Sequence, residues 1–229
     1  MKQLLEFSKG LDNAKLAKIT EYKSVYYYDL PSGWSCSFAG TCKSKADRNT
    51  GKVTDGKNID FRCYATSQES IYKNLRNKRW RNFDKLRKLK TVDDMFNLLD
   101  ESFKQLPRSV DCIRIHTSGD FFSERYFLSW VKLATKYSNV LFYAYTKSIP
   151  YWVNNLDKIP DNMVLTASYG STRDDLIREY NLSNVKVFKS IEDIDKANLP
   201  LDTNETNAIN GTKEFALLIH GTQPKKEKV

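Results

Sequence analysis

The chain has 229 residues, of which 40% are hydrophobic and 13% aromatic, so it can build a core and is not an intrinsically disordered protein. No apolar run approaches the ~20 residues that span a bilayer, and the charged start of the chain lacks a signal-peptide pattern. We therefore expect no membrane partner and a cytoplasmic location. The net charge of +9 is uneven: residues 1–90 carry 20 Lys and Arg against 9 Asp and Glu, and residues 91–229 carry 17 against 19. This asymmetry predicts a polyanionic partner.

The first half of the chain combines one strand, one long connection and two helices. Aromatic and β-branched residues predict a strand at Ser24–Leu30. The connection that follows, residues 31–66, has little periodic pattern and contains three cysteines. Helices are predicted at Ser67–Leu89, within the basic helical segment 67–90, and at Val92–Leu106, where Thr91 is the expected N-cap.

From residue 111 onward, strand and helix patterns alternate. The predicted strands are Asp111–Thr117, Val140–Thr146, Met163–Tyr169, Val185–Ser190 and Phe215–Gly221. The predicted helices are Ser123–Tyr137, Tyr151–Leu156, Thr172–Tyr180 and Ile191–Ala197. About six βα units predict a single α/β domain over residues 1–224 with a mostly parallel sheet, which forms a partial or complete barrel or stays open. The basic tail 225–229 is expected to be disordered.

Polar residues follow five of the predicted strands, and ligands of parallel sheets bind beyond the carboxyl ends of the strands. Alternation along the strand puts Arg114 on the same side as His116. The candidate catalytic residues are His116, Asp120, Lys147 and His220. Structural interpretations stand beside these roles: His116 as a hydrogen-bonding partner of a neighbouring loop, Asp120 as the cap of the next helix, and His220 as a turn-ordering residue.

The long connection holds three cysteines in the spacing C-x5-C-x20-C: Cys36, Cys42 and Cys63. A metal bound through thiolates would order such a connection. Disulfides are disfavoured in the cytoplasm, and three cysteines cannot pair evenly. Free cysteines without a function are an alternative, because the spacing is no standard zinc pattern. Zinc would need a fourth ligand, whereas a [4Fe–4S] cluster on three cysteines leaves one iron open. Cys112, within a strand, is expected to be an ordinary buried thiol.

The segment Lys73–Lys90 contains nine basic residues and one acidic residue. Such a stretch is typical of a surface that binds nucleic acid, or of a solvated helix face. The candidate nucleic-acid contacts are Lys73, Arg76, Lys78, Arg79 and Arg81.

Several blocks of the sequence resemble the bacteriophage gene product 88 family: LPSGWSCSFAGTCKSKADRNTGKVTDG, FRCYATSQE, RIHTSGDFFSERYFLSW, FYAYTKS and FALLIHGTQP. Together they span most of residues 30–224. The resemblance implies a phage protein that works in the host-cell cytoplasm, and it brings no activity with it.

A looser resemblance is to the radical S-adenosylmethionine enzymes. It rests on a first strand that runs into a three-cysteine loop, on the ending Cys63-Tyr64-Ala65, and on the βα units behind it. The resemblance implies a [4Fe–4S] cluster on the three cysteines, S-adenosylmethionine on its fourth iron, and cofactor contacts from Ser118, Gly119 and Asp120. The usual spacing in these enzymes is C-x3-C-x2-C, and this chain inserts more residues.

Three functions follow as hypotheses. The first is an iron–sulfur enzyme of the radical S-adenosylmethionine type that modifies a nucleic acid or a host protein. The second is a nucleic-acid-binding phage protein with a structural metal site and no catalysis. The third is a metal-assisted hydrolase that uses His116, Asp120 and His220.

Overall fold

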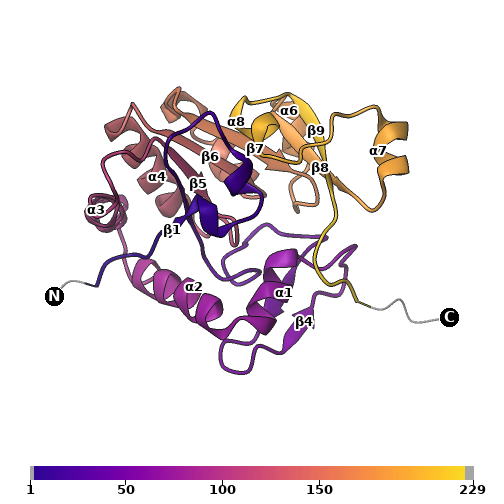
Figure 1. Ribbon diagram of the computed structural model, residues 1–229, viewed down its shortest axis with the longest axis horizontal. Helices are drawn as coiled ribbons and strands as arrows, with labels where there is room; N and C mark the ends of the chain where they lie inside the picture. Colours follow the sequence, from indigo (N-terminus) through magenta and orange to yellow (C-terminus); the bar gives the residue numbers. More distant parts are fainter. Residues whose placement is uncertain (1–2, 225–229) are drawn as a thin grey trace.

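The computed structural model describes residues 3–224, so the tail 225–229 lies outside the described residues. Its main sheet has the strand order β1-β2-β5-β6-β7-β8-β9 (Figure 1). The strands are β1 (Ser8–Lys9), β2 (Val25–Tyr28), β5 (Cys112–Ile115), β6 (Leu141–Thr146), β7 (Met163–Ser168), β8 (Asn184–Phe188) and β9 (Glu214–Leu218). β1 is antiparallel to β2, and all other neighbours are parallel. The predicted α/β class and mostly parallel sheet are confirmed.

The helices connect strands that follow one another both in the chain and in the sheet. They are α1 (Tyr64–Ile71), α2 (Lys73–Leu86), α3 (Val92–Phe103), α4 (Glu124–Lys136), α5 (Ile149–Val153), α6 (Asp175–Glu179), α7 (Ile191–Ala197) and α8 (Thr206–Ile209). Each parallel strand is added next to its predecessor, so every crossover moves in the same direction across the sheet. Helices α2 to α6 pack on one face of the sheet, whereas α8 packs on the other.

The helix-covered face holds the larger core. The predicted helix Ser123–Tyr137 is present as α4, and its Phe127 and Trp130 are buried there against strand residues such as Ile113 and Phe142. Ser123 begins this helix by accepting a hydrogen bond from the Tyr126 amide. The carboxyl ends of the strands are thereby held against a rigid layer.

The opposite face of the sheet has a smaller core of its own. Two short 3-10 turns, Gly10–Asp12 and Leu16–Lys18, lie in the N-terminal segment that covers this face together with α8. Tyr143 and Phe215 are buried under them, and so is Cys112, the buried thiol expected from the sequence. No helix within residues 3–224 is long and apolar enough to cross a membrane.

The cysteine connection contains more structure than its sequence predicts. β3 (Ser44–Ala46) and β4 (Val53–Asp55) form a separate antiparallel hairpin, and α1 begins three residues before the predicted helix start. Tyr72, with an extended backbone (φ −99°, ψ 91°), divides the predicted helix Ser67–Leu89 into α1 and α2. Figure 1 shows α1, α2 and β4 together below the sheet. Strands of three residues are too short for alternation to reveal them.

Candidate functional site

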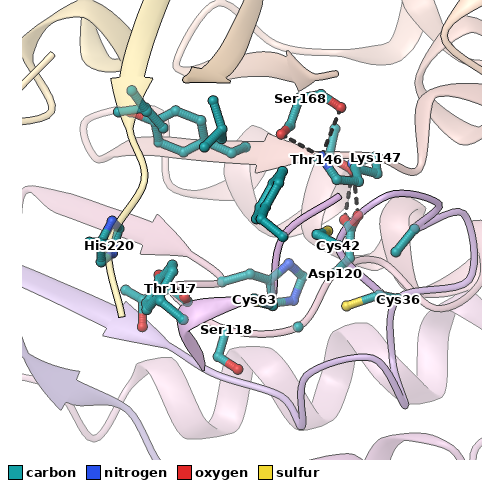
Figure 2. Close-up of a pocket in the computed structure, with 18 of the residues that line it drawn as sticks. Cys36, Cys42, Cys63, Thr117, Ser118, Asp120, Thr146, Lys147, Ser168 and His220 are labelled. Carbon is teal, nitrogen blue, oxygen red and sulfur yellow. Dashed lines mark hydrogen bonds between the residues drawn. The ribbon is translucent and has the colours of Figure 1, made fainter. Parts of the chain in front are cut away.

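A cavity of about 180 Å³ lies beyond the carboxyl ends of the parallel strands (Figure 2). The three cysteines of the long connection line it together with residues that follow β5, β6 and β9. All four predicted catalytic residues line the same cavity: His116, Asp120, Lys147 and His220. The structure therefore brings the predicted site residues together in one place, apart from the basic residues of α2.

The cysteine thiols are half-buried and close enough to influence one another. Burial raises the pKa of Cys36 well above its usual range, and Asp120, Cys63 and Cys42 raise it further. The Gly33 amide, 3.3 Å from the Cys36 sulfur, opposes this shift as a hydrogen-bond donor. Burial also raises the pKa of Cys63 to about 12, with Cys42 as the second cause. The Cys36 and Cys63 thiols therefore stay protonated unless a cationic centre is bound beside them.

The three thiols do not form a site for a single ion. No set of three or more His, Cys, Asp or Glu side chains among residues 3–224 is arranged to hold a metal ion. The sulfur ligands of zinc all lie ~2.3 Å from one centre and hence close to one another. The sequence-based alternative of a zinc site at Cys36, Cys42 and Cys63 finds no support in this arrangement.

Asp120 connects the end of β5 to the end of β6. Its carboxylate accepts hydrogen bonds from the Thr146 hydroxyl at 2.6 Å, the Lys147 amide at 2.8 Å and the Phe121 amide at 2.7 Å. Burial raises its pKa, although these hydrogen bonds oppose the shift. Asp120 is not the cap of the following helix, because Ser123 has that role. Asp120 is instead a buried acceptor in the wall of the cavity.

Lys147 follows β6 directly, and its ammonium group lies across the end of β7. It donates to the Ser168 hydroxyl at 2.7 Å, the Ser168 carbonyl at 3.1 Å and the Tyr169 carbonyl at 2.5 Å (Figure 2). The side chain is buried, so the positive charge stays inside the cavity wall. Lys147 thus holds the ends of two neighbouring strands in register.

His116 departs from the strand alternation that the sequence predicts. Its backbone is left-handed (φ 64°), so the ring turns away from Arg114 and toward α4. There Nε2 lies 2.9 Å from the Tyr126 hydroxyl, while Nδ1 is buried without a hydrogen-bond partner in the described part of the chain. Burial and then Arg114 lower the pKa of His116 to about 3. A neutral ring with one open nitrogen lines the cavity.

His220 lies on the other side of the cavity, just after β9. Its ring lies against that of Tyr64, with 4.3 Å between the ring centroids and 32° between the ring planes, and Tyr64 donates a hydrogen bond to the Thr117 carbonyl. Gly221 follows with a φ of 84°, and a Cβ there would come within 2.8 Å of the Tyr64 Cβ. His220 is therefore more than a turn residue, because it forms one wall of the cavity with Tyr64.

The Ser118-Gly119 turn packs against the start of the cysteine connection. Ser118 donates through its hydroxyl to the Leu30 carbonyl at 2.9 Å, and its amide donates to Asp29 at 2.9 Å. Gly119 has a φ of 84°, and a Cβ at this position would lie 2.5 Å from the Ser35 hydroxyl. The turn that the resemblance assigns to a cofactor thus also anchors the cysteine connection.

Two of the predicted nucleic-acid contacts lie in the protein interior. Arg79 is 1% exposed and contacts Glu69 at 2.9 Å and Asp29 at 3.3 Å, and Arg76 donates to backbone carbonyls, including that of Arg48 at 3.0 Å. Their guanidinium groups are used by the fold and cannot reach a phosphate. Of the remaining contacts, Lys73 and Arg81 are exposed and Lys78 is half-buried. For these three the role stays a prediction.

The acidic partners of Arg79 on helix α2, which are Asp29 and Glu69, were not identified from the sequence. Asp29 follows the buried strand β2 directly, which is a usable signal because a carboxylate at the end of such a strand faces the site edge. Glu69 lies within α1 with no comparable signal. Both carboxylates also hold the loop after β5: Asp29 accepts from Thr117 at 2.6 Å, and Glu69 accepts from Ser118 at 3.2 Å.

Comparison with known proteins gives one family and one curated relative. The model of the family described as Gene product 88 matches residues 4–228. The Gene 88 protein of Mycobacterium phage D29 is 32% identical over 91 residues, which are 37% of this chain and 38% of that protein. The aligned stretch thus spans well under two thirds of the relative. No solved structure matches the chain.

Proposed function

This chain belongs to the gene product 88 family, and we propose that it holds a [4Fe–4S] cluster on its three loop cysteines and uses it with S-adenosylmethionine. The observation that carries the proposal is the shared cavity: three thiols from one connection line it beyond the ends of consecutive parallel strands. That edge of a parallel sheet is where ligands bind in this class of fold. The looser resemblance of the sequence to the radical S-adenosylmethionine enzymes supports the cofactor part of the proposal.

The donor set suits a cluster better than it suits one ion. In a [4Fe–4S] cluster each cysteine binds a different iron, so the sulfur ligands are farther apart than around zinc. The absence of a single-ion arrangement among residues 3–224 is therefore compatible with a cluster. Burial raises the pKa of Cys36 and of Cys63, so a bound cluster would have to displace the protons of both thiols.

Asp120 is positioned to orient the amino group of a bound cofactor. A carboxylate offers about four acceptor sites, and three hydrogen bonds reach Asp120 from Thr146, Lys147 and Phe121. An ammonium group at the remaining site would lower the pKa that burial raises. His116, neutral because burial holds its pKa near 3, would direct Nδ1 to a polar atom of the ligand.

When bound, the cluster supplies the electron that cleaves S-adenosylmethionine, and the chain supplies the site in which this happens. Gly119 lets the loop after β5 approach Ser35 closely, which holds the cysteine connection over the strand ends. Tyr64 and His220 form one wall of the cavity. The substrate that enters the cavity beside this wall would determine the reaction.

Metal and sulfide analysis of anaerobically purified protein tests the proposal. We expect about four iron and four sulfide per chain and a brown colour. Cys63→Ala should lose most of both, because one thiolate ligand is gone. Cys112→Ala is the matched control, since this thiol is buried on the opposite face of the sheet from the helices and is not part of the cavity lining. It should retain iron and sulfide in full.

The alternative function, nucleic-acid binding with a structural metal and no catalysis, has a different signature. Colourless protein that contains zinc, with no sulfide, would favour it and would contradict the cluster. Protein without metal, or equal loss of iron in the Cys63→Ala and Cys112→Ala variants, would also rule out the cluster proposal.

A further inference from the structure

A second cavity of about 480 Å³ lies beside the cysteine cavity. The N-terminal segment around Lys15 forms one wall, and Gln68 and Tyr72, at the end of α1, form another. The two cavities share several lining residues: Tyr64, Arg114, Thr117, Tyr145, Leu217 and His220. Tyr64 and His220 line both cavities and therefore lie between the cysteines and the larger chamber. Its volume is in the range of small-molecule sites.

Buried polar groups at the junction lack partners. Arg114 is 7% exposed, and its Nε has no hydrogen-bond partner within residues 3–224, although a terminal nitrogen pairs with Glu205. The Tyr145 hydroxyl is also buried and unpartnered in the described chain, and Arg114 lies 4.2 Å from the centroid of that ring. Leaving such groups unsatisfied costs free energy. A ligand with hydrogen-bonding atoms at its edge would satisfy them.

The charges that line the chamber are largely matched within the protein. Glu205 lies 2.8 Å from Lys15 and also pairs with Arg114, and Asp29 lies 3.3 Å from Arg79. The interior of the chamber therefore suits a ligand group without net charge. A charged group would have to break one of these buried pairs, which is costly.

Aromatic rings and amide side chains make up much of the remaining lining. The rings are those of Tyr27, Tyr64, Tyr72 and Tyr145, and the amides are those of Asn13 and Gln68. The Gln68 oxygen accepts from Arg79 at 3.2 Å, so this amide is held in place. Flat walls with fixed polar groups suit a planar ring that carries donors and acceptors along its edge.

The exposed residues around the chamber carry charges of both signs. Tyr72, which lines the chamber, is 59% exposed, and the exposed Lys73 follows it, whereas the exposed Asp12 lies in the lining on the N-terminal side. A neutral ring inside and a phosphate on the Lys73 side would therefore be complementary to this part of the protein.

We propose that the chamber binds one base of a single-stranded nucleic acid, with the adjoining phosphates near Lys73. A single-stranded nucleic acid would then be the substrate of the proposed iron–sulfur site, and only this part of the inference, the reaction on the nucleic acid, rests on the proposed function. Base binding itself needs no cluster. The base would lie against Tyr72 with its polar edge toward Arg114 and Tyr145, next to the wall that faces the cysteines.

Fluorescence anisotropy with a labelled 12-nucleotide single strand, a duplex of the same sequence and an abasic strand of the same length tests the proposal. We expect the single strand to bind about tenfold more tightly than the abasic strand, because stacking on an aromatic side chain is lost without the base. Tyr72→Ala should remove most of this difference, and Tyr72→Phe should keep it. Tyr180→Ala is the matched control, because Tyr180 is also an exposed tyrosine but lies outside the cavity lining.

Equal affinity for the normal and abasic strands would overturn the proposal, and so would equal effects of the Tyr72→Ala and Tyr180→Ala changes. Tighter binding of the duplex would also contradict it. Repeating the titration with Cys63→Ala separates the two proposals. Retained preference for the base in this variant supports the chamber, even where metal and sulfide analysis of the unchanged protein has ruled out the cluster.

Discussion

The loop after β5 contains two residues with a left-handed backbone, His116 with a φ of 64° and Gly119 with a φ of 84°. Such a conformation costs glycine little and other residues roughly 1–2 kcal/mol. It persists at His116 because the ring is held by its neighbours, 4.8 Å from the Phe121 centroid and 2.9 Å from the Tyr126 hydroxyl. The neighbours of His116 therefore set the shape of the cavity wall.

Acid should destabilise the protein through His116. Its pKa in the folded chain, about 3, lies below the ordinary value of 6.5 because of burial and then Arg114. Between these pH values the unfolded chain binds a proton that the folded chain does not. The stabilisation is therefore complete above about pH 6.5 and is lost as the pH falls toward 3. From pH 7 to pH 5 we expect a loss of about 2 kcal/mol, measured by urea unfolding.

Two histidine variants separate this effect from other titrations. His116→Asn has no titrating ring and tolerates a left-handed backbone, so its loss between pH 7 and pH 5 should be about 2 kcal/mol smaller. Burial lowers the pKa of His220 in the same direction, but this residue is exposed, so His220→Asn should keep most of the loss. Equal acid losses in the two variants would contradict the role of His116.

Gly119 is expected to tolerate no side chain. A Cβ there would lie 2.5 Å from the Ser35 hydroxyl and 2.6 Å from the Leu30 Cβ, in addition to the backbone cost. Gly119→Ala should therefore lower the free energy of unfolding by about 3 kcal/mol. Gly211→Ala is the control, because its φ is also positive (64°) but its nearest contact is 3.6 Å away. It should lose only about 1 kcal/mol; equal losses in urea unfolding would contradict close approach at Gly119.

The buried face of helix α2 carries arginines as well as the apolar residues Trp80 and Phe83. Arg79 reaches Asp29, which follows β2, and Glu69 on α1. Arg76 donates to the backbone around Arg48 in the loop between β3 and β4. The helix is therefore joined to the cysteine connection by charge-assisted hydrogen bonds and to the sheet by packing.

Matching substitutions on this one helix should have very different effects. Arg79→Gln leaves Asp29 and Glu69 buried without their cation and should cost about 3–5 kcal/mol of unfolding free energy. Arg81→Gln breaks an exposed pair with Glu6 and should cost less than about 1 kcal/mol. Denaturant unfolding of both variants measures the contrast. Similar small losses would mean that the buried network does not stabilise the fold.

Across the whole molecule, the parallel strands are added in chain order, so their carboxyl ends meet at one edge, and helices α2 to α6 lie on one face. The other face is covered by a different part of the chain, the N-terminal segment with α8. This division creates the two adjoining cavities, one under the cysteine connection and one under the N-terminal segment. The base-binding and metal-binding predictions both follow from this arrangement of the whole molecule.

Much of the fold and part of the candidate site could be predicted from the sequence. All six parallel strands lie within the predicted ranges or one residue beyond them, because long apolar runs between turn residues are local signals. The gathering of His116, Asp120 and Lys147 at one edge follows from the parallel order. The burial of the Arg79 side chain could not be predicted, because one of its partners, Asp29, is distant in the chain and the other, Glu69, lies on a different helix.

By itself, the sequence determined the α/β class, the approximate elements and the edge at which the polar residues gather, because these depend on patterns within about 20 residues. Only the tertiary structure decided which basic side chains remain at the surface, how His116 turns, and that a second chamber adjoins the cysteines. Those features arise from contacts between segments that lie far apart in the chain. No local pattern of charge or hydrophobicity encodes them.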